Sequence, residues 1–295
     1  MTTDNISIIG GGIGGIVTAL CFEKLNISYT LYERTEEIKA VGAGIWLSPN
    51  ALQVFEWIDP ALLAEIQQSG NPLTRILVAD HQLKPISDSD QAFAKQQFGY
   101  TTLAIHRGRL QQILYNYAQR KNIELGRAFR KFTDNGEQLT LHFESGRTVN
   151  TNSIIGADGI HSNVRKQLFP ESKLRYSGQT CWRGVSNFSM DREFESVGFT
   201  LWGEKLQFGV SKIAEGKVYW FAVKRSAPNL QDNREQLKNE LTALLSPFHH
   251  IVNDLIENTP LDSIIRGDLR DLELLDSWSK PVSYTHLTLP TSTHG

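Results

Sequence analysis

Glycines near the start of the chain have a spacing that can bind the phosphates of a dinucleotide. The segment 10–15 reads GGGIGG and follows a short β-branched run at residues 6–9. Gly10 permits a tight turn out of that strand, Gly12 lets a pyrophosphate approach the backbone, and Gly15 lets the next helix pack closely. The free N–H groups at the helix start then face the phosphate charge. The pattern predicts a phosphate-binding turn, to which Ile13 and Gly14 also belong.

An acidic residue follows at the distance that a ribose contact requires. The stretch 16–25 is apolar with helical spacing, and a second strand at residues 27–32 ends at Glu33. In dinucleotide sites a carboxylate about 20 residues beyond the glycines accepts hydrogen bonds from a ribose. Glu33 fits that role, and Arg34 beside it is a further candidate for cofactor contact. This order of elements favours a dinucleotide site over a chance glycine loop, but it does not separate NAD from FAD.

A second carboxylate lies at the end of another predicted strand. Residues 153–155 lead through a turn that contains Asp158 and Gly159 into a helix that Ser162 is expected to cap. The carboxyl ends of strands are where open α/β sheets bind ligands. The alternative is that Asp158 only caps the helix. The glycine pattern in the same chain favours ligand binding.

A cation stands at the start of a third predicted helix. Residues 107–117 have the spacing of an amphipathic helix, with Leu110 and Leu114 on its buried face. The helix dipole disfavours a cation such as Arg107 at this end, and a bound pyrophosphate would remove the conflict. The alternative is an exposed surface arginine, which is how we interpret the neighbouring Arg109.

The composition limits the classes of protein to consider. The 295 residues, of which 40% are hydrophobic and 21% charged, suffice for two domains of ordinary globular composition. A formal charge of −2 gives no support for binding to nucleic acid or an anionic membrane. No apolar run approaches the ~20 residues of a membrane span, and no basic and apolar leader precedes the first strand, so we expect a cytoplasmic protein. The two cysteines and eight histidines predict neither a disulfide framework nor a metal site.

Together these features resemble the class A flavoprotein monooxygenases, the aromatic-ring hydroxylases with the p-hydroxybenzoate hydroxylase fold. Within that family the chain resembles the urate hydroxylase and zeaxanthin epoxidase branch, over essentially its whole length to about residue 280. Residues 10–15 match the first motif, 107–114 the Arg-x-x-Leu-x-x-x-Leu helix and 156–159 the Asp-Gly motif. The segment 42–50 is similar to the family's glycine-rich flavin loop. The resemblance implies these cofactor residues: Gly10, Gly12, Ile13, Gly14, Gly15, Glu33, Arg34, Gly44, Ser48, Arg107, Asp158 and Gly159.

The resemblance also implies an architecture. We expect an α/β fold in which a doubly wound, Rossmann-like FAD-binding domain is interleaved with an α+β substrate domain built on a mostly antiparallel sheet. The expected boundaries are 1–72 and 98–172 for the FAD-binding domain, and 73–97 and 173–266 for the substrate domain. Strand-like segments after residue 175 support the sheet. Residues 81–97 are expected to be irregular, and residues 231–257 to be helical with a break at Pro247.

The activity implied by the resemblance is a monooxygenation. NAD(P)H would reduce a bound FAD, and the reduced flavin would deliver oxygen from O2 to a small aromatic or conjugated substrate. Candidate pocket residues on the sheet are Trp182, Arg183, Gln207, Phe208 and Trp220. Arg183 could hold an anionic or enolic substrate, or it could be a satisfied sheet-edge residue. Two alternatives stay open: an FAD-dependent oxidoreductase without oxygen transfer and, for the chain as given, an inactive nucleotide-binding fragment. The sequence predicts no oligomeric state.

One motif of the family is absent, and the tail of the chain suggests why. The family has an apolar strand and Gly-Asp-Ala-Ala-His near its C-terminus, whereas the pair at residues 267–268 lacks both neighbours and is interpreted as a turn. Residues 282–291 read VSYTHLTLPT. A transposon end used in sequencing libraries, GTC TCT TAT ACA CAT CTG ACG CTG CCG ACG, encodes the same ten residues. We therefore expect residues 282–295 to be a non-native segment that replaces the third motif. The alternative is a natural polar tail, which resequencing with a different library chemistry would reveal.

Overall fold

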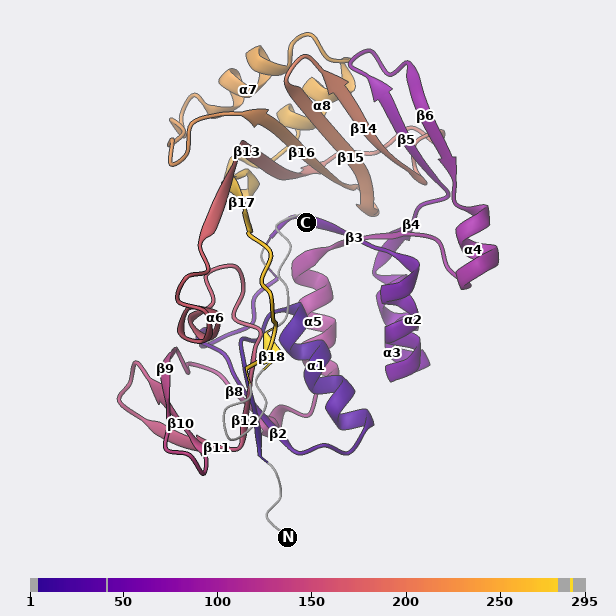
Figure 1. The fold of residues 1–295 in the computed structure, drawn as a ribbon. Coiled ribbons are helices and arrows are strands. Elements are labelled where there is room, and N and C mark those ends of the chain that lie inside the picture. The colour runs from indigo at the N-terminus through magenta and orange to yellow at the C-terminus, as the bar shows by residue number, and fades with distance from the viewer. Residues whose placement is uncertain (1–4, 41, 281–286, 289–295) are drawn as a thin grey trace. The chain divides into compact units, whose positions relative to one another are not determined.

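The computed structural model describes residues 5–40, 42–280 and 287–288 (Figure 1). Its contacts divide the chain into two compact units, each made of separate segments. Unit 1 contains Met1–Ala40, Gln111–Arg175 and Arg270–His294. Unit 2 contains Val41–Leu110 and Tyr176–Leu269. The α/β fold with interleaved segments that the sequence predicts is therefore present.

Unit 1 is built around a parallel sheet of five strands in the order β18-β12-β1-β2-β8. Parallel neighbours require crossover connections, and α1 supplies the one between β1 and β2. Because both faces of such a sheet are covered, its strands are short apolar runs rather than alternating ones. The strands are β1 (Ile6–Ile9), β2 (Tyr29–Tyr32), β8 (Ile123–Glu124), β12 (Ser153–Gly156) and β18 (Leu287–Thr288), and the helix is α1 (Ile13–Lys24).

An antiparallel meander packs against the parallel sheet of unit 1. Aromatic side chains of the meander, Phe129, Phe132 and Phe143, form one core with Ile154 of β12 and with α6. Ser162 caps α6 as predicted, because its hydroxyl oxygen accepts a hydrogen bond from the Arg165 N–H at 2.9 Å. The elements are β9 (Phe129–Asp134), β10 (Leu139–Phe143), β11 (Thr148–Thr151), the 3₁₀ turn η1 (Arg120–Asn122) and α6 (Asn163–Leu168).

Unit 2 contains a sheet of seven strands in the order β17-β13-β16-β15-β14-β5-β6. The pairings of β13 with β16, β16 with β15, β15 with β14, and β5 with β6 are antiparallel, whereas β14 and β5 pair in parallel. Strands β13 and β17 begin or end in unit 1. The bounds are β5 (Arg75–Asp80), β6 (Pro85–Asp90), β13 (Leu174–Asn187), β14 (Val197–Gly203), β15 (Leu206–Ala214), β16 (Lys217–Arg225) and β17 (Ile265–Leu272).

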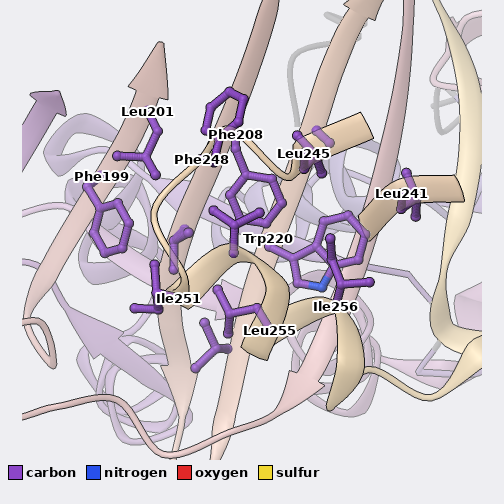
Figure 2. Packing of buried hydrophobic residues seen from close by; sticks show 14 of the residues in the cluster. Phe199, Leu201, Phe208, Trp220, Leu241, Leu245, Phe248, Ile251, Leu255 and Ile256 are labelled. Carbon is purple, nitrogen blue, oxygen red and sulfur yellow. The ribbon is translucent and has the colours of Figure 1, made fainter. Parts of the chain in front are cut away.

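Two helices cover one face of this sheet and form the largest core of unit 2 (Figures 1 and 2). Figure 2 shows Phe199, Phe208 and Trp220 of the sheet turned toward the side chains of the helices. The Phe208 and Trp220 rings stack with centroids 5.5 Å apart. The Trp220 indole N–H donates to the Thr259 hydroxyl at 2.8 Å, so its one polar atom is satisfied inside the core. The helices are α7 (Leu237–Leu245) and α8 (Ile251–Glu257), followed by the 3₁₀ turn η2 (Leu261–Ser263).

A small antiparallel sheet, β3-β7-β4, completes unit 2 together with α2, α3 and α4. Helix α5 starts directly after β7 and continues from unit 2 into unit 1. The bounds are β3 (Gly44–Leu47), β4 (Gly70–Pro72), β7 (Leu103–His106), α2 (Pro49–Ile58), α3 (Pro60–Gln68), α4 (Ala92–Phe98) and α5 (Arg107–Tyr117).

Two local predictions were wrong. Residues 81–97 are not irregular, because they contain β6 and most of α4. All six residues of β6 are exposed, so the strand has no apolar alternation to detect. Residues 267–268 do not form a turn but lie inside β17, where the Asp268 carboxylate accepts a hydrogen bond from the Asn229 N–H at 2.9 Å.

Most of the predicted non-native segment, residues 282–295, lies outside the described residues. Its described part is β18, which pairs in parallel with β12. Within the part of the chain that the structure describes, no helix combines the length and apolarity of a membrane span.

Candidate functional site

The glycine turn of unit 1 is closed so tightly that two of its positions admit no side chain. Gly10 has a φ of +108°, and a Cβ there would lie 2.3 Å from the Ala157 carbonyl oxygen. A Cβ on Gly15 would lie 1.9 Å from the carbonyl oxygen of Gly10. Both obstacles are backbone atoms, which cannot rotate away. The end of β1, the start of α1 and the turn after β12 are therefore packed backbone on backbone.

Gly12 differs from those two glycines because it faces open space. No atom of the described residues lies within 4 Å of a Cβ built on it. It is the N-cap of α1, with an extended backbone and no capping side chain, and the first turn of the helix has no acidic residue. The N–H groups of this turn therefore remain available to an anion. Ile13 is partly exposed and Gly14 exposed at the same helix start.

Glu33 is turned toward the glycine turn. One carboxylate oxygen accepts the Gly11 N–H at 2.6 Å, and the other accepts the Thr35 N–H at 2.9 Å. An ionised carboxylate has about four acceptor positions, so two remain for a ribose hydroxyl. Arg34 is exposed beside it. Glu33 thus stabilises the turn as well as standing where a ribose contact was predicted.

Gln111 is a residue that the sequence reasoning missed. Its side-chain N–H donates to the Gly11 carbonyl oxygen at 2.7 Å. A signal was available, because Gln111 lies four residues after Arg107 and therefore on the same face of α5. Polar residues in a helix are common, however, and nothing in the sequence indicates which loop a glutamine contacts.

The two carboxylate oxygens of Asp158 differ in their hydrogen bonding. Oδ2 accepts the N–H groups of Asn163 and Val164 at 2.7 and 3.3 Å, so Asp158 does cap the start of α6. Oδ1 is buried and has no hydrogen-bond partner among the described residues. Burying a carboxylate oxygen without a partner is costly. Asp158 therefore caps the helix, as the alternative interpretation predicts, but this role does not account for the buried Oδ1. Gly159 follows with a φ of +79°.

In unit 2 the predicted flavin loop meets the start of α5. The Arg107 N–H donates to the Ala43 carbonyl oxygen at 2.8 Å, and the Arg107 side chain runs alongside Gly42. Arg107 is exposed and forms no ion pair with any residue that the structure describes. Ser48 is the N-cap residue of α2. A free cation at a helix start is electrostatically unfavourable, so Arg107 is suited to an anionic partner.

The same loop is packed against the seven-stranded sheet. Gly44 lies under the ring of Tyr219, and a Cβ on Gly44 would be 2.3 Å from the Tyr219 Cγ. The Trp46 indole N–H donates to the Ser211 hydroxyl at 2.9 Å. The loop therefore contacts the face of the sheet that lies opposite α7 and α8.

This second face of the sheet carries Arg183 beside Tyr219. Arg183 pairs with Phe221 across β13 and β16, and Tyr219 lies two residues from Phe221, so the three side chains share a face. Burial raises the pKa of Tyr219 to about 12, while the Arg183 guanidinium opposes the rise. Burial likewise raises the pKa of the Cys181 thiol to about 11. With a pKa of about 12, the Tyr219 hydroxyl is neutral at physiological pH and can donate a hydrogen bond.

The five predicted pocket residues do not share a face. Trp182, Phe208 and Trp220 belong to the core beneath α7 and α8, with exposures of 5%, 0% and 0%. Figure 2 shows Phe208 and Trp220 in this core. Their side chains fill that core. Arg183 is partly buried and Gln207 is exposed, and both alternate with the core residues along their strands. Period-two alternation shows that neighbours point apart, but it does not indicate which set faces a ligand.

The predicted cofactor residues thus form two groups. Unit 1 brings together the glycine turn, Glu33 and the Asp158 turn, with Gln111 in addition. Unit 2 brings together Gly44, Ser48 and Arg107. The open position at Gly12 and the unpartnered Asp158 oxygen fit FAD, which carries a pyrophosphate and many hydroxyl donors.

Comparison with known proteins places the chain in a family. The FAD binding domain family matches residues 2–251. The chain therefore belongs to the FAD-binding class A flavoprotein monooxygenases, as the motifs predicted.

Its relatives include a monooxygenase/isomerase and several epoxidases. It is 34% identical over 277 residues to an aurachin C monooxygenase/isomerase of Stigmatella aurantiaca, covering 92% of this chain and 70% of that protein. It is 30% identical over 301 residues to a chloroplastic zeaxanthin epoxidase of Prunus armeniaca, covering 96% of this chain and 44% of that one. The chain thus spans less than half the length of the zeaxanthin epoxidases that it matches.

Solved structures share the fold. Klebsiella pneumoniae HpxO, complexed with FAD and uric acid, superposes with a TM-score of 0.86 at 21% identity, over 97% of this chain and 72% of that one. The 2,6-dihydroxypyridine-3-hydroxylase of Arthrobacter nicotinovorans gives 0.79 at 16% identity, over 98% of this chain and 77% of that one. The predicted α/β fold class is thereby confirmed.

Proposed function

We propose that this chain belongs to an FAD-dependent monooxygenase that uses NAD(P)H and O2 to hydroxylate or epoxidise a small aromatic or conjugated substrate. The observation that carries the proposal is the contact of Gly44 with Tyr219. It joins the loop that resembles the flavin loop to the sheet face that carries Arg183. A flavin held by this loop and a substrate held by this face would be neighbours within one unit.

The cofactor roles follow from the geometry of each residue. The Gly12 N–H and the start of α1 would bind pyrophosphate, and Glu33 would accept ribose hydroxyls through its unused positions. Asp158 Oδ1 would accept a hydroxyl donor of the cofactor, which would satisfy its buried lone pairs. Arg107 would neutralise phosphate charge. When bound, FAD would supply the redox and oxygen chemistry, and the protein would supply position and electrostatics.

The sheet face supports a substrate class. Arg183 provides a cation and Tyr219 a neutral hydroxyl donor, and the aromatic rings of Phe221 and Trp46 lie on the same side of the sheet. A planar substrate with an anionic or enolic oxygen fits such a surface, because Arg binds oxyanions and stacks on flat rings. The relatives that act on aurachin C and zeaxanthin support an electron-rich, unsaturated substrate.

Purification of the chain gives the first test. We expect a yellow protein with about one FAD per chain and NAD(P)H-dependent oxygen uptake that an added electron-rich phenol accelerates. Bound FAD with NAD(P)H oxidation, but with no oxygen in the product, would mean an oxidoreductase without oxygen transfer. A colourless protein that takes up no FAD would contradict the cofactor proposal for this chain.

Gly12→Ala tests the phosphate site with little risk to folding. The new methyl group meets no atom within 4 Å, and the backbone at φ −70° suits alanine. The methyl would occupy the space proposed for pyrophosphate, so we expect the Kd for FAD to rise about tenfold or more. The melting temperature of the apoprotein should stay within about 2 °C.

The control is Gly267→Ala in β17, where a Cβ also meets nothing within 4 Å. We expect it to change neither FAD affinity nor melting temperature. Equal FAD affinity in the two variants, measured by flavin fluorescence, would contradict the assignment of the phosphate site to Gly12.

A further inference from the structure

Gln111 contacts the glycine turn through one well-formed hydrogen bond. Its side-chain N–H donates to the Gly11 carbonyl oxygen at 2.7 Å across 100 residues of sequence. Gln111 is partly buried and Gly11 is buried. The contact is therefore tertiary, and it involves a residue outside the motif positions that the sequence indicated.

Glu33 contacts the same glycine from its other side. The Gly11 N–H, which Glu33 accepts at 2.6 Å, belongs to the peptide between residues 10 and 11. The Gly11 carbonyl, which Gln111 binds, belongs to the peptide between residues 11 and 12. Glycine has a wide choice of backbone angles, so these two bonds restrict a position that would otherwise be adaptable.

The direction of the Gly12 N–H follows from peptide geometry. The C=O and N–H of a trans peptide point to opposite sides, and the described residues contain no cis peptide. Because the carbonyl between residues 11 and 12 points at Gln111, the Gly12 N–H points away from it. This N–H has no acceptor among the described residues, and the space around Gly12 is open.

We propose that Gln111 is a positioning residue that aims the Gly12 N–H at the pyrophosphate of the cofactor. The inference rests on the proposed function, because it requires a pyrophosphate at this turn. Gln111 acts through the peptide between residues 11 and 12 and needs no contact with the cofactor. Without its amide the peptide can rotate, and the donor loses its fixed direction.

The test compares ligands with and without a pyrophosphate on the full chain. Gln111→Met keeps the length of the side chain but removes the donor. We expect it to raise the Kd for FAD and for ADP roughly tenfold and to change the Kd for adenosine less than about twofold. Gln111→His restores a neutral N–H donor at similar reach, and we expect it to recover most of the ADP affinity. Isothermal titration with ADP and adenosine measures these differences.

The matched control is Gln112→Met on the same helix. Gln112 is also partly exposed, and its side chain makes no hydrogen bond to a described residue, so all three affinities should stay unchanged. If Gln111→Met fails to fold, Gln111→Asn takes its place, because its amide is one methylene too short to reach Gly11.

The outcomes separate this inference from the function on which it rests. An equal loss of ADP and adenosine binding, or no loss of either, would overturn the positioning role alone. A wild-type chain that binds neither ADP nor FAD would overturn the cofactor site and the positioning role together. Selective loss of ADP binding, recovered by histidine, supports the inference.

Discussion

Glycines perform different tasks in the two units. In unit 1, Gly10 and Gly15 lie against backbone carbonyl oxygens. In unit 2, five glycines lie against aromatic rings of neighbouring elements. The pairs are Gly44 with Tyr219, Gly184 with Trp220, Gly198 with Trp46, Gly203 with Phe248, and Gly209 with Phe221.

The two kinds of glycine contact suit the different surfaces of the two units. Backbone packing in unit 1 lets the chain turn sharply and expose N–H groups at the start of α1, where a phosphate can reach them. Ring packing in unit 2 lets large side chains lie flat on the sheet and fill its two faces. A backbone obstacle is fixed, whereas a ring can rotate or be truncated. Substitutions can therefore test whether the two kinds of glycine differ in practice.

The largest effect is expected for Gly15→Ala. Its methyl group would lie 1.9 Å from the Gly10 carbonyl oxygen, so β1 and α1 must separate. We expect unit 1 to lose about 3 kcal/mol or more of unfolding free energy, at the upper end of overpacking effects. Urea unfolding measured by circular dichroism provides the value.

No side-chain truncation should relieve this strain, because the obstacle is backbone. A Gly15→Ala variant with wild-type stability would show that the turn can widen. The contrast with unit 2 would then fail.

A smaller and reversible effect is expected for Gly44→Ala. The methyl group would lie 2.3 Å from the Tyr219 Cγ, so the ring must move. We expect a loss of about 1–3 kcal/mol. Tyr219→Ala alone should also destabilise the protein, but the double variant should be more stable than the sum of the two losses predicts, because the ring is gone. Additive losses in this double-mutant cycle would show that Gly44 is strained by its backbone instead.

The smallest effect concerns the two cysteines, one in each unit. Cys21 is partly exposed on α1, whereas Cys181 is 2% exposed and has a pKa raised to about 11 by burial. Since the thiolate is the reactive form, native Cys181 should react with a thiol reagent at pH 8 at least about tenfold more slowly than Cys21.

Labelling followed by peptide mass spectrometry then reports each unit separately. Gly44→Ala should accelerate labelling of Cys181 and leave Cys21 unchanged. Similar acceleration of both thiols would mean that the units open together.

The sequence predicted the glycine turn well because each part of it has a distinct local cause. The strand, the glycines at fixed offsets, the helix and the acid each appear in order, and the predicted cap at Ser162 is present. The five predicted pocket residues, in contrast, lie on opposite faces of the sheet. A strand such as β13 has apolar residues on both faces, so alternation separates Trp182 from Arg183 without showing which one packs under helices. That information comes from α7 and α8, which lie more than 50 residues further along the chain.

Contacts between segments that are distant in the sequence also could not be predicted from it. Gln111 approaches Gly11 only because α5 and the glycine turn come together in the folded unit. The exposed strand β6 has no apolar period, and β17 contains a Gly-Asp pair that is typical of turns. In these cases contacts between distant segments of the chain determine the structure. The local sequence pattern gives no indication of these contacts or predicts a different structure.

The alternation on β13 has a consequence for how such proteins diversify. Trp182 lies in the core under the helices, and its neighbour Arg183 lies on the opposite face beside Tyr219. A core position such as Trp182 is constrained by packing, whereas a partly exposed position such as Arg183 lies outside that core and can change at less cost to the fold. Substitutions at alternate positions of such a strand can therefore change substrate preference during evolution, while the positions between them preserve the core that stabilises the fold.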